Sequence, residues 1–187
     1  MSRVNTAKNY IKLDFRQQFN NQGFTKTGLE AEGALSFGGS SLPAEYCPKG
    51  LFEMEGVPYE LFVDEPNGDN IELEGQTIFF GKNMYKKIHI LGASNNGDFY
   101  ESIQLVNDDQ FIASYRVHLT DFVSREPKFG NRLAVEFPYI NNKIGELKQF
   151  IPKIWCDSIT FDQPLEFNCI KFGDNPSMHI FSITLEY

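Results

Sequence analysis

The sequence has few of the residues and motifs that usually build disulfide scaffolds, metal sites or familiar enzyme sites. Its three cysteines, Cys47, Cys156 and Cys169, are odd in number and form no Cys-x-x-Cys pair. That pattern argues against a disulfide framework and against a zinc site, so we expect reduced thiols that are mostly buried. The sequence contains no Gly-x-Ser-x-Gly, His-Glu-x-x-His, P-loop or dinucleotide-binding motif.

Positive charge and long apolar runs are also scarce. The 17 basic residues are outnumbered by 25 acidic ones, the net charge is −8, and Lys86-Lys87 is the densest basic pair. A surface that follows nucleic-acid phosphates is therefore not expected. The N-terminal residues MSRVNTAKNYIKLDF contain no apolar signal-peptide core, and no apolar run is long enough to span a membrane. We expect a cytoplasmic protein, or an extracellular one from which a leader has been removed.

What the sequence does contain is typical of β-structure. Hydrophobic residues make up 41% of the 187 residues, and 18 phenylalanines with 8 tyrosines favour a sheet core. Short alternating segments recur between turn signals, and only residues 145–150 have the composition of a helical turn. The sequence predicts a single all-β domain over residues 1–187, an antiparallel β-sandwich of the jelly-roll type.

The stretch Lys87–Glu101 shows this organisation best. Isoleucine and histidine in residues 87–91 favour a core strand. Residues 92–98, GASNNGD, favour a turn because glycine, asparagine and aspartate tolerate positive φ. Residues 99–106 then resume an alternating pattern. We predict a strand, a polar loop exposed to solvent and a second strand.

Similar patterns predict strands elsewhere in the chain. A hairpin is expected where residues 51–54 and 57–63 flank Glu55-Gly56. Residues 77–80 form a short predicted strand that ends at Gly81, and residues 111–119 alternate regularly. Three further strands are predicted near the C-terminus, at residues 150–161, 167–172 and 178–185.

Several short phrases, taken in order, resemble a known type of module. They are Ser41-Leu42-Pro43-Ala44-Glu45, Gly56-Val57-Pro58-Tyr59, Asp69-Asn70-Ile71 followed by Gly75-Gln76-Thr77-Ile78, and Ile88-His89-Ile90-Leu91-Gly92-Ala93 followed by Asn96-Gly97-Asp98. In this order and spacing, in the part of the chain before Pro127, they resemble the β-sandwich modules appended to bacterial glycoside hydrolases. The resemblance implies a galactose-binding-like jelly roll with a non-catalytic, carbohydrate-binding function.

On such a module, polar loop side chains would bond sugar hydroxyls while an aromatic face stacks on the sugar ring. The candidate ligand contacts in the central loop and its flank are Asn95, Asn96, Asp98 and Tyr100. The single tryptophan, Trp155, is a candidate stacking platform, although a tryptophan is more often part of the core.

Two further groups of residues are candidates for ligand or metal binding. A second polar loop tip contains Tyr139, Asn141 and Asn142. Calcium is a candidate cofactor, because jelly-roll modules of this kind often bind it through loop oxygens. The candidate calcium ligands are Asp64, Asp69 and Asn70.

The three histidines carry the main alternative to a binding module. His89, His118 and His179 each lie among apolar neighbours in an alternating segment, where a histidine is more often structural. If His89 and His118 converge with a carboxylate such as Glu101 on a concave sheet face, a small sugar-processing enzyme or a metal site becomes the better interpretation. A third interpretation is an interaction protein whose exposed face binds another protein or its own copy in a homo-oligomer.

Overall fold

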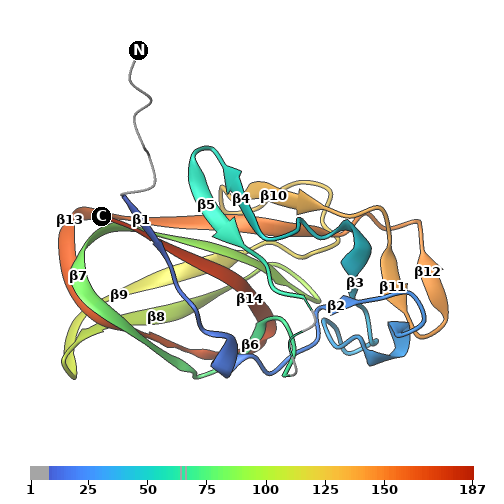
Figure 1. Ribbon diagram of the computed structural model, residues 1–187, viewed down its shortest axis with the longest axis horizontal. Coiled ribbons are helices and arrows are strands. Elements are labelled where there is room, and N and C mark those ends of the chain that lie inside the picture. Colours follow the sequence, from blue (N-terminus) through green and yellow to red (C-terminus); the bar gives the residue numbers. More distant parts are fainter. Residues whose placement is uncertain (1–8, 64, 66) are drawn as a thin grey trace, which may run out of the picture.

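The computed structural model describes residues 9–63, 65 and 67–187 (Figure 1). Its regular structure is almost entirely β-strand. Within the described residues there is no α-helix, only three 3-10 turns: η2 (Arg16–Gln18), η3 (Glu30–Glu32) and η4 (Ala44–Tyr46). No helix in that part of the chain has the length and apolarity needed to cross a membrane. The prediction of an all-β chain is confirmed.

The strands, in chain order, are β1 (Tyr10–Lys12), β2 (Phe24–Thr25), β3 (Leu42–Pro43), β4 (Leu51–Met54), β5 (Val57–Glu60), β6 (Ile71–Glu74), β7 (Thr77–Ser94), β8 (Phe99–Asn107), β9 (Gln110–Leu119), β10 (Arg132–Glu136), β11 (Ile140–Asn142), β12 (Gly145–Leu147), β13 (Lys153–Phe172) and β14 (Asp174–Glu186).

One large antiparallel sheet dominates the fold. Its strand order is β1-β14-β7-β13-β8-β9, with β6 paired to β14 and β10 paired to β13. The two longest strands, β7 and β13, run side by side and bend together (Figure 1). Register shifts in β13, between Thr160 and Leu165 and between Phe167 and Cys169, lie along this bend. Such bulges raise the local twist and allow a sheet to curve around a core.

The two faces of this sheet carry separate cores. Because side chains alternate along a strand, Ile88 and Ile90 of β7 pack into one core together with Ile159 of β13. Leu91 of β7 and Cys156 of β13 point to the opposite face and pack into a second core. The small sheets β2–β3, β4–β5 and β11–β12 contribute Phe24, Leu42, Val57, Tyr59 and Ile140 to that second core. We call the face that carries Leu91 and Cys156 the outer face of the sheet.

The predicted strand–loop–strand unit is confirmed as β7 and β8, but its loop is shorter than predicted. β7 continues to Ser94, so the glycine at position 92 is part of a strand. A Cβ atom at Gly92 would lie 2.6 Å from the carbonyl oxygen of His179. Close approach of β14 therefore explains this glycine, whereas we had interpreted it as a turn residue.

Other strand predictions were partly right. The hairpin around Glu55-Gly56 is confirmed, and both residues have the positive φ that a tight hairpin requires, 53° and 81°. β7 passes through Gly81 without ending, and β13 is one strand where two were predicted. Residues 145–147, where the composition allowed a helical turn, form β12, which pairs with β11.

Candidate functional site

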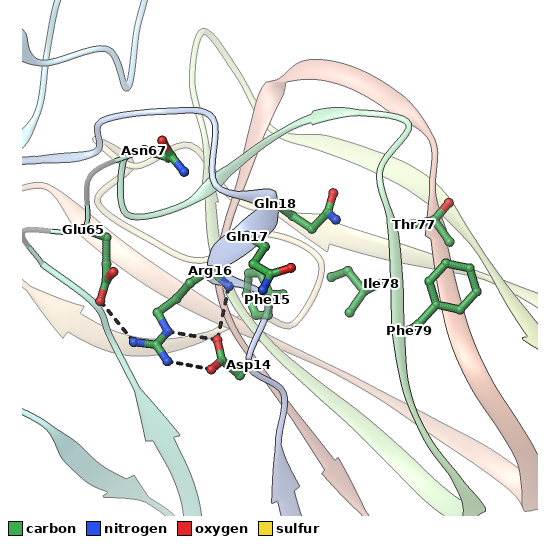
Figure 2. A pocket seen from close by; sticks show the side chains of 10 residues that line it. All are labelled: Asp14, Phe15, Arg16, Gln17, Gln18, Glu65, Asn67, Thr77, Ile78 and Phe79. Carbon is green, nitrogen blue, oxygen red and sulfur yellow. Dashed lines mark hydrogen bonds and ion pairs between the residues drawn. The ribbon is translucent and has the colours of Figure 1, made fainter.

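A surface hollow lies where the segment after β1 meets the start of β7 (Figure 2). Its volume is about 520 Å³, and we call it the η2 hollow. It is lined by Asp14, Phe15, Arg16, Gln17, Gln18, Glu65, Asn67, Thr77, Ile78 and Phe79. The buried rings of Phe15 and Phe19, whose centroids lie 5.5 Å apart, anchor η2 and leave the residues between them exposed.

The polar centre of the η2 hollow is an ion cluster. The Arg16 guanidinium donates to Asp14 from Nε at 2.9 Å and from Nη2 at 2.6 Å, and to Glu65 from Nη1 at 3.3 Å. The hydrogen bond from Arg16 lowers the pKa of Asp14. Figure 2 shows Thr77 and Phe79 on one side of the β7 ribbon and Arg16 on the other, with Ile78 between them. The exposed Phe79 ring therefore points away from the polar centre. A ring that stacks on a sugar held there would have to face it.

A second surface combines exposed rings with polar side chains. β8 and β9 pair so that Tyr100 lies opposite His118, Ser102 opposite Arg116, and Gln104 opposite Ser114. These six positions share one face of the sheet, and all except the partly buried His118 are exposed. We call this surface, together with the neighbouring Phe129, the β8–β9 face.

Three aromatic rings form a row on the β8–β9 face. The Tyr100 and His118 ring centroids lie 5.8 Å apart, and those of His118 and Phe129 lie 5.1 Å apart. Tyr100 is 50% exposed and Phe129 is 51% exposed. Exposed aromatic side chains in contact with one another give a ligand a continuous apolar platform.

The polar groups beside these rings are free to bond a ligand. Within the residues that the structure describes, no protein group bonds the hydroxyls of Tyr100 and Ser102 or the amide of Gln104. The Arg116 guanidinium carbon lies 4.5 Å from the centroid of the Tyr100 ring. This cation–π contact steadies the ring. It also places a positive charge on the platform, and no described carboxylate pairs with that charge.

Phe129 has an unusual backbone. Its φ is 54°, in the left-handed region, and the next residue, Gly130, has φ 77°. A bulky residue in this region costs about 1–2 kcal/mol relative to the right-handed conformation. Burial does not offset that cost, since the ring is half exposed. Strain of this kind is concentrated at binding and catalytic sites.

Below the rings, Asp157 joins β13 to β9. One carboxylate oxygen accepts the backbone N–H of His118 at 2.8 Å, and the other accepts the backbone N–H of Ser158 at 3.0 Å. Burial raises the pKa of Asp157. Because both oxygens already accept backbone hydrogen bonds, Asp157 positions the end of β9.

A family model describes most of this chain. The model of the AziU2-like beta-sandwich domain matches residues 7–149. The chain belongs to the AziU2-like beta-sandwich domain family. A search of curated proteins found no match. The match confirms the β-sandwich prediction, and it includes all of β8, β9 and Phe129.

In this AziU2-like domain, the predicted residues of the central loop differ in their exposure. Asn95 is buried and donates to the carbonyl of Leu35 at 2.9 Å. Asn96 is exposed with φ 60°. Asp98 is partly buried and accepts the backbone N–H of Asp121 at 2.9 Å. Of the four predicted contacts near this loop, only Tyr100 lies on the β8–β9 face.

Trp155 is part of the packed interior. Its side chain is 1% exposed, and its indole Nε1 donates to the carbonyl of Asp121 at 3.0 Å. A ring without an exposed face cannot stack on a sugar, so the interpretation of Trp155 as a stacking platform is corrected. The structure supports the alternative interpretation, in which Trp155 is a core residue whose indole N–H has a hydrogen-bond partner.

The second predicted loop tip is mostly occupied by internal contacts. Asn141 is 2% exposed and donates to the backbone carbonyl of Thr25 at 3.2 Å. Asn142 donates to the carbonyl of Gly38 at 2.8 Å. Tyr139 packs edge to face against Tyr46, with centroids 5.8 Å apart. These contacts join the region of β11 to Thr25, Gly38 and Tyr46. The three residues are not part of the β8–β9 face.

Two of the three predicted calcium ligands, Asp69 and Asn70, form hydrogen bonds within the protein. Asp64 lies outside the described residues. Asp69 is fully buried, and its carboxylate accepts from the backbone N–H groups of Gly23 and Phe24 and from the side chains of Gln22 and Asn70, each at 2.8 Å. Asn70 is buried as well. No group of three or more His, Cys, Asp or Glu side chains suited to a metal ion occurs among the described residues.

His89 and His118 have different side-chain partners. His89 contacts Ser158 and Glu186, whereas His118 lies beside Asp157 and Phe129. Glu101 accepts a hydrogen bond from the backbone N–H of Ser102.

The residues of the β8–β9 face that were not predicted from the sequence are Ser102, Gln104, Ser114, Arg116 and Phe129. For the four of these residues on β8 and β9, the available signal was the Asp108-Asp109 turn, because it fixes which residues of the two strands stand opposite each other.

Proposed function

We propose that this protein binds a carbohydrate on the β8–β9 face, and that this face holds the sugar without catalysis. The observation that carries the proposal is the row of exposed rings, Tyr100, His118 and Phe129, bordered by unbonded polar groups on the same face. A sugar ring has an apolar C–H surface and a rim of hydroxyls. Rings and hydrogen-bonding side chains together complement both.

The positive charge of Arg116 indicates which class of sugar the β8–β9 face should prefer. Arg116 stands on the platform without a carboxylate partner among the described residues, and a guanidinium bonds a carboxylate through two parallel N–H groups. A saccharide that carries a uronic acid should therefore bind more tightly than its neutral counterpart. The difference should shrink as salt is added, because exposed charges are screened.

The same geometry argues for binding without catalysis. The carboxylate of Asp157 lies 3.7 Å from Nδ1 of His118, and both of its oxygens accept backbone N–H groups. A carboxyl group can act as a general acid or base only within hydrogen-bond reach of the substrate. The β8–β9 face offers rings, hydroxyls, an amide and a guanidinium, which are groups that hold a ligand.

A screen of the purified chain against immobilised neutral, amino and uronic saccharides, in calcium and in chelator, tests the proposal. Selective retention on uronic saccharides, weakened in the Arg116→Gln variant, is the expected result. Arg116 is exposed, so this substitution should leave the fold intact. Failure to retain any saccharide class, or retention that Arg116→Gln leaves unchanged, would overturn it. A role for calcium would appear as retention that depends on the metal.

A further inference from the structure

A second polar cluster lies on the outer face of the large sheet, on β7, β13 and β14. His89 of β7 stands directly opposite Ser158 of β13 on one side and Thr184 of β14 on the other. Leu91 and Cys156 of the second core lie on this face, and the next outward-facing pair along the strands is His89 and Ser158. Glu186 lies on the same face. His89 is 4% exposed, whereas Ser158 is exposed to solvent.

The three polar side chains form a linked series of hydrogen bonds. Nδ1 of His89 lies 2.8 Å from Oγ of Ser158, and Nε2 lies 3.2 Å from Oε2 of Glu186. A carboxylate can only accept a hydrogen bond, so Nε2 must carry the imidazole proton. In the neutral ring, Nδ1 then has a free lone pair and accepts the hydroxyl proton of Ser158. This is the arrangement of a nucleophile, a base and a group that orients the base.

The neighbours of His89 keep it neutral. Burial lowers the pKa of His89; the hydrogen bond and charge of Glu186 act in the opposite direction, and the positive charges of Arg132 and Lys87 lower the pKa further. The Tyr10 ring of β1 lies beside it, with centroids 6.3 Å apart. A neutral imidazole at physiological pH is the form that can take a proton from a hydroxyl.

Arg132 of β10 completes the cluster. Its Nη2 donates to Oγ of Ser158 at 2.8 Å, and its Nη1 is paired with Glu55 in the β4–β5 turn. The backbone N–H of Ser158 is taken by Asp157. The guanidinium is therefore the donor in place beside Ser158 to stabilise negative charge on a reacting oxygen.

We propose that Ser158 is a nucleophile that cleaves small acyl esters, with His89 as its general base and Glu186 as the residue that positions His89. The contacts of Ser158 Oγ are His89, Arg132 and the Cys156 sulfur at 3.8 Å. Polar and charged neighbours of this kind suit a short acyl group such as acetyl and give no apolar surface for a long chain.

The proposed reaction passes through an acyl-serine intermediate. Ser158 Oγ attacks the ester carbonyl carbon while its proton moves to Nδ1 of His89, and Arg132 stabilises the resulting oxyanion. The bond between the acyl carbon and the alcohol oxygen then breaks, and the alcohol leaves with the proton from His89. Water attacks the acyl-serine, again giving a proton to His89. Breaking the Oγ–C bond releases the carboxylic acid and returns that proton to Ser158.

Hydrolysis of p-nitrophenyl acetate, followed by the release of p-nitrophenol and by the intact mass of the protein, tests the proposal. Wild-type protein should show an acetyl adduct on the peptide that contains Ser158. Ser158→Ala should lose the adduct and slow the release about a hundredfold. Thr160→Ala is the matched control, because Thr160 is an exposed hydroxyl residue on the same strand and face. Equal rates in wild type and Ser158→Ala, or an adduct on another residue, would overturn the proposal.

The pH profile separates a positioning role of Glu186 from a structural one. The rate should fall as pH drops through the pKa of His89, which lies below the ordinary 6.5. Glu186→Gln removes the negative charge that favours the imidazolium, so it should move this fall to lower pH as well as slow the reaction. An unchanged profile in Glu186→Gln would contradict its role. The site shares no residue with the β8–β9 face, so Ser158→Ala should keep sugar binding and Phe129→Asn should keep esterase activity.

Discussion

The side-chain amide nitrogen of Asn95 lies 2.9 Å from Nε2 of His179, and both side chains are buried. On the other side of the ring, Nδ1 of His179 lies 3.1 Å from Oδ1 of Asn70. The amide nitrogen can only donate, so Nε2 accepts and Nδ1 carries the proton. These hydrogen bonds connect the loop after β7 to β14 and to the start of β6. Polar residues that resembled ligand contacts in the sequence are here part of the framework.

Acid should weaken the fold through His179. Burial lowers the pKa of His179 to about 4 from the ordinary 6.5. In the unfolded chain His179 therefore binds a proton near pH 6.5, whereas in the folded chain it binds one only near pH 4. Stability is fully present above pH 6.5 and is lost as pH falls through that window, by about 2 kcal/mol between pH 7 and pH 5. Urea unfolding at both pH values measures the loss.

The His179→Gln variant is the control for this prediction. It should be less stable at pH 7 but should show a smaller loss on going to pH 5. His89, whose pKa is also lowered by burial, contributes to the slope in both proteins, so the difference between the two slopes reports His179. An identical slope in wild type and variant would show that His179 is not the group responsible.

Asp69→Asn should destabilise the fold severely. The carboxylate accepts four N–H hydrogen bonds, from Gly23, Phe24, Gln22 and Asn70. An asparagine would turn an N–H donor towards some of these donors and remove the charge that strengthens all four bonds. We expect a loss of about 3 kcal/mol in the free energy of unfolding. Substituting an exposed residue, as in Asp109→Asn, gives the comparison and should change stability little; equal losses would contradict the assignment.

Trp155→Ala should lower stability without affecting ligand binding directly. The substitution removes a fully buried ring and leaves the carbonyl of Asp121 without its donor. Loss of a core aromatic side chain costs about 3–5 kcal/mol. Thermal unfolding measures the change, and binding is measured at a temperature where the variant is still folded. A stable Trp155→Ala protein that has lost sugar binding would restore the stacking interpretation.

Local patterns predicted the strands well where the signals were local. The hairpin at Glu55-Gly56 and the pair β7–β8 follow from turn residues and alternation. Gly92 was misinterpreted because its reason lies in β14, where the carbonyl of His179 approaches it. β13 was divided in two at residues 162–166, which the structure places inside one strand with a register shift between Thr160 and Leu165.

The site was harder to predict than the fold. Tyr100 and His118 were named individually, but their contact depends on the register of β8 and β9. Phe129 carries no local signal of function, because its exposure and its positive φ exist only in the folded chain. Asparagine and aspartate, conversely, suit both solvated loops and buried networks. Sequence alone does not separate Asn96, which is exposed, from Asn95, which is buried.

A comparison of Phe129→Asn with wild type, in both stability and saccharide affinity, shows whether the β8–β9 face binds sugar. Asparagine tolerates positive φ better than phenylalanine, so the variant should be as stable as wild type or up to about 1 kcal/mol more stable. If Phe129 stacks on sugar, affinity should fall roughly fivefold, from the loss of about 1 kcal/mol.

Phe111→Ala is the matched control, because Phe111 is a 63% exposed ring at the opposite end of β9. Calorimetric titration with the saccharide selected by the screen should show weaker binding for Phe129→Asn and wild-type binding for Phe111→Ala. Wild-type affinity in Phe129→Asn, together with an undiminished fold, would contradict the claim that the β8–β9 face is the binding site.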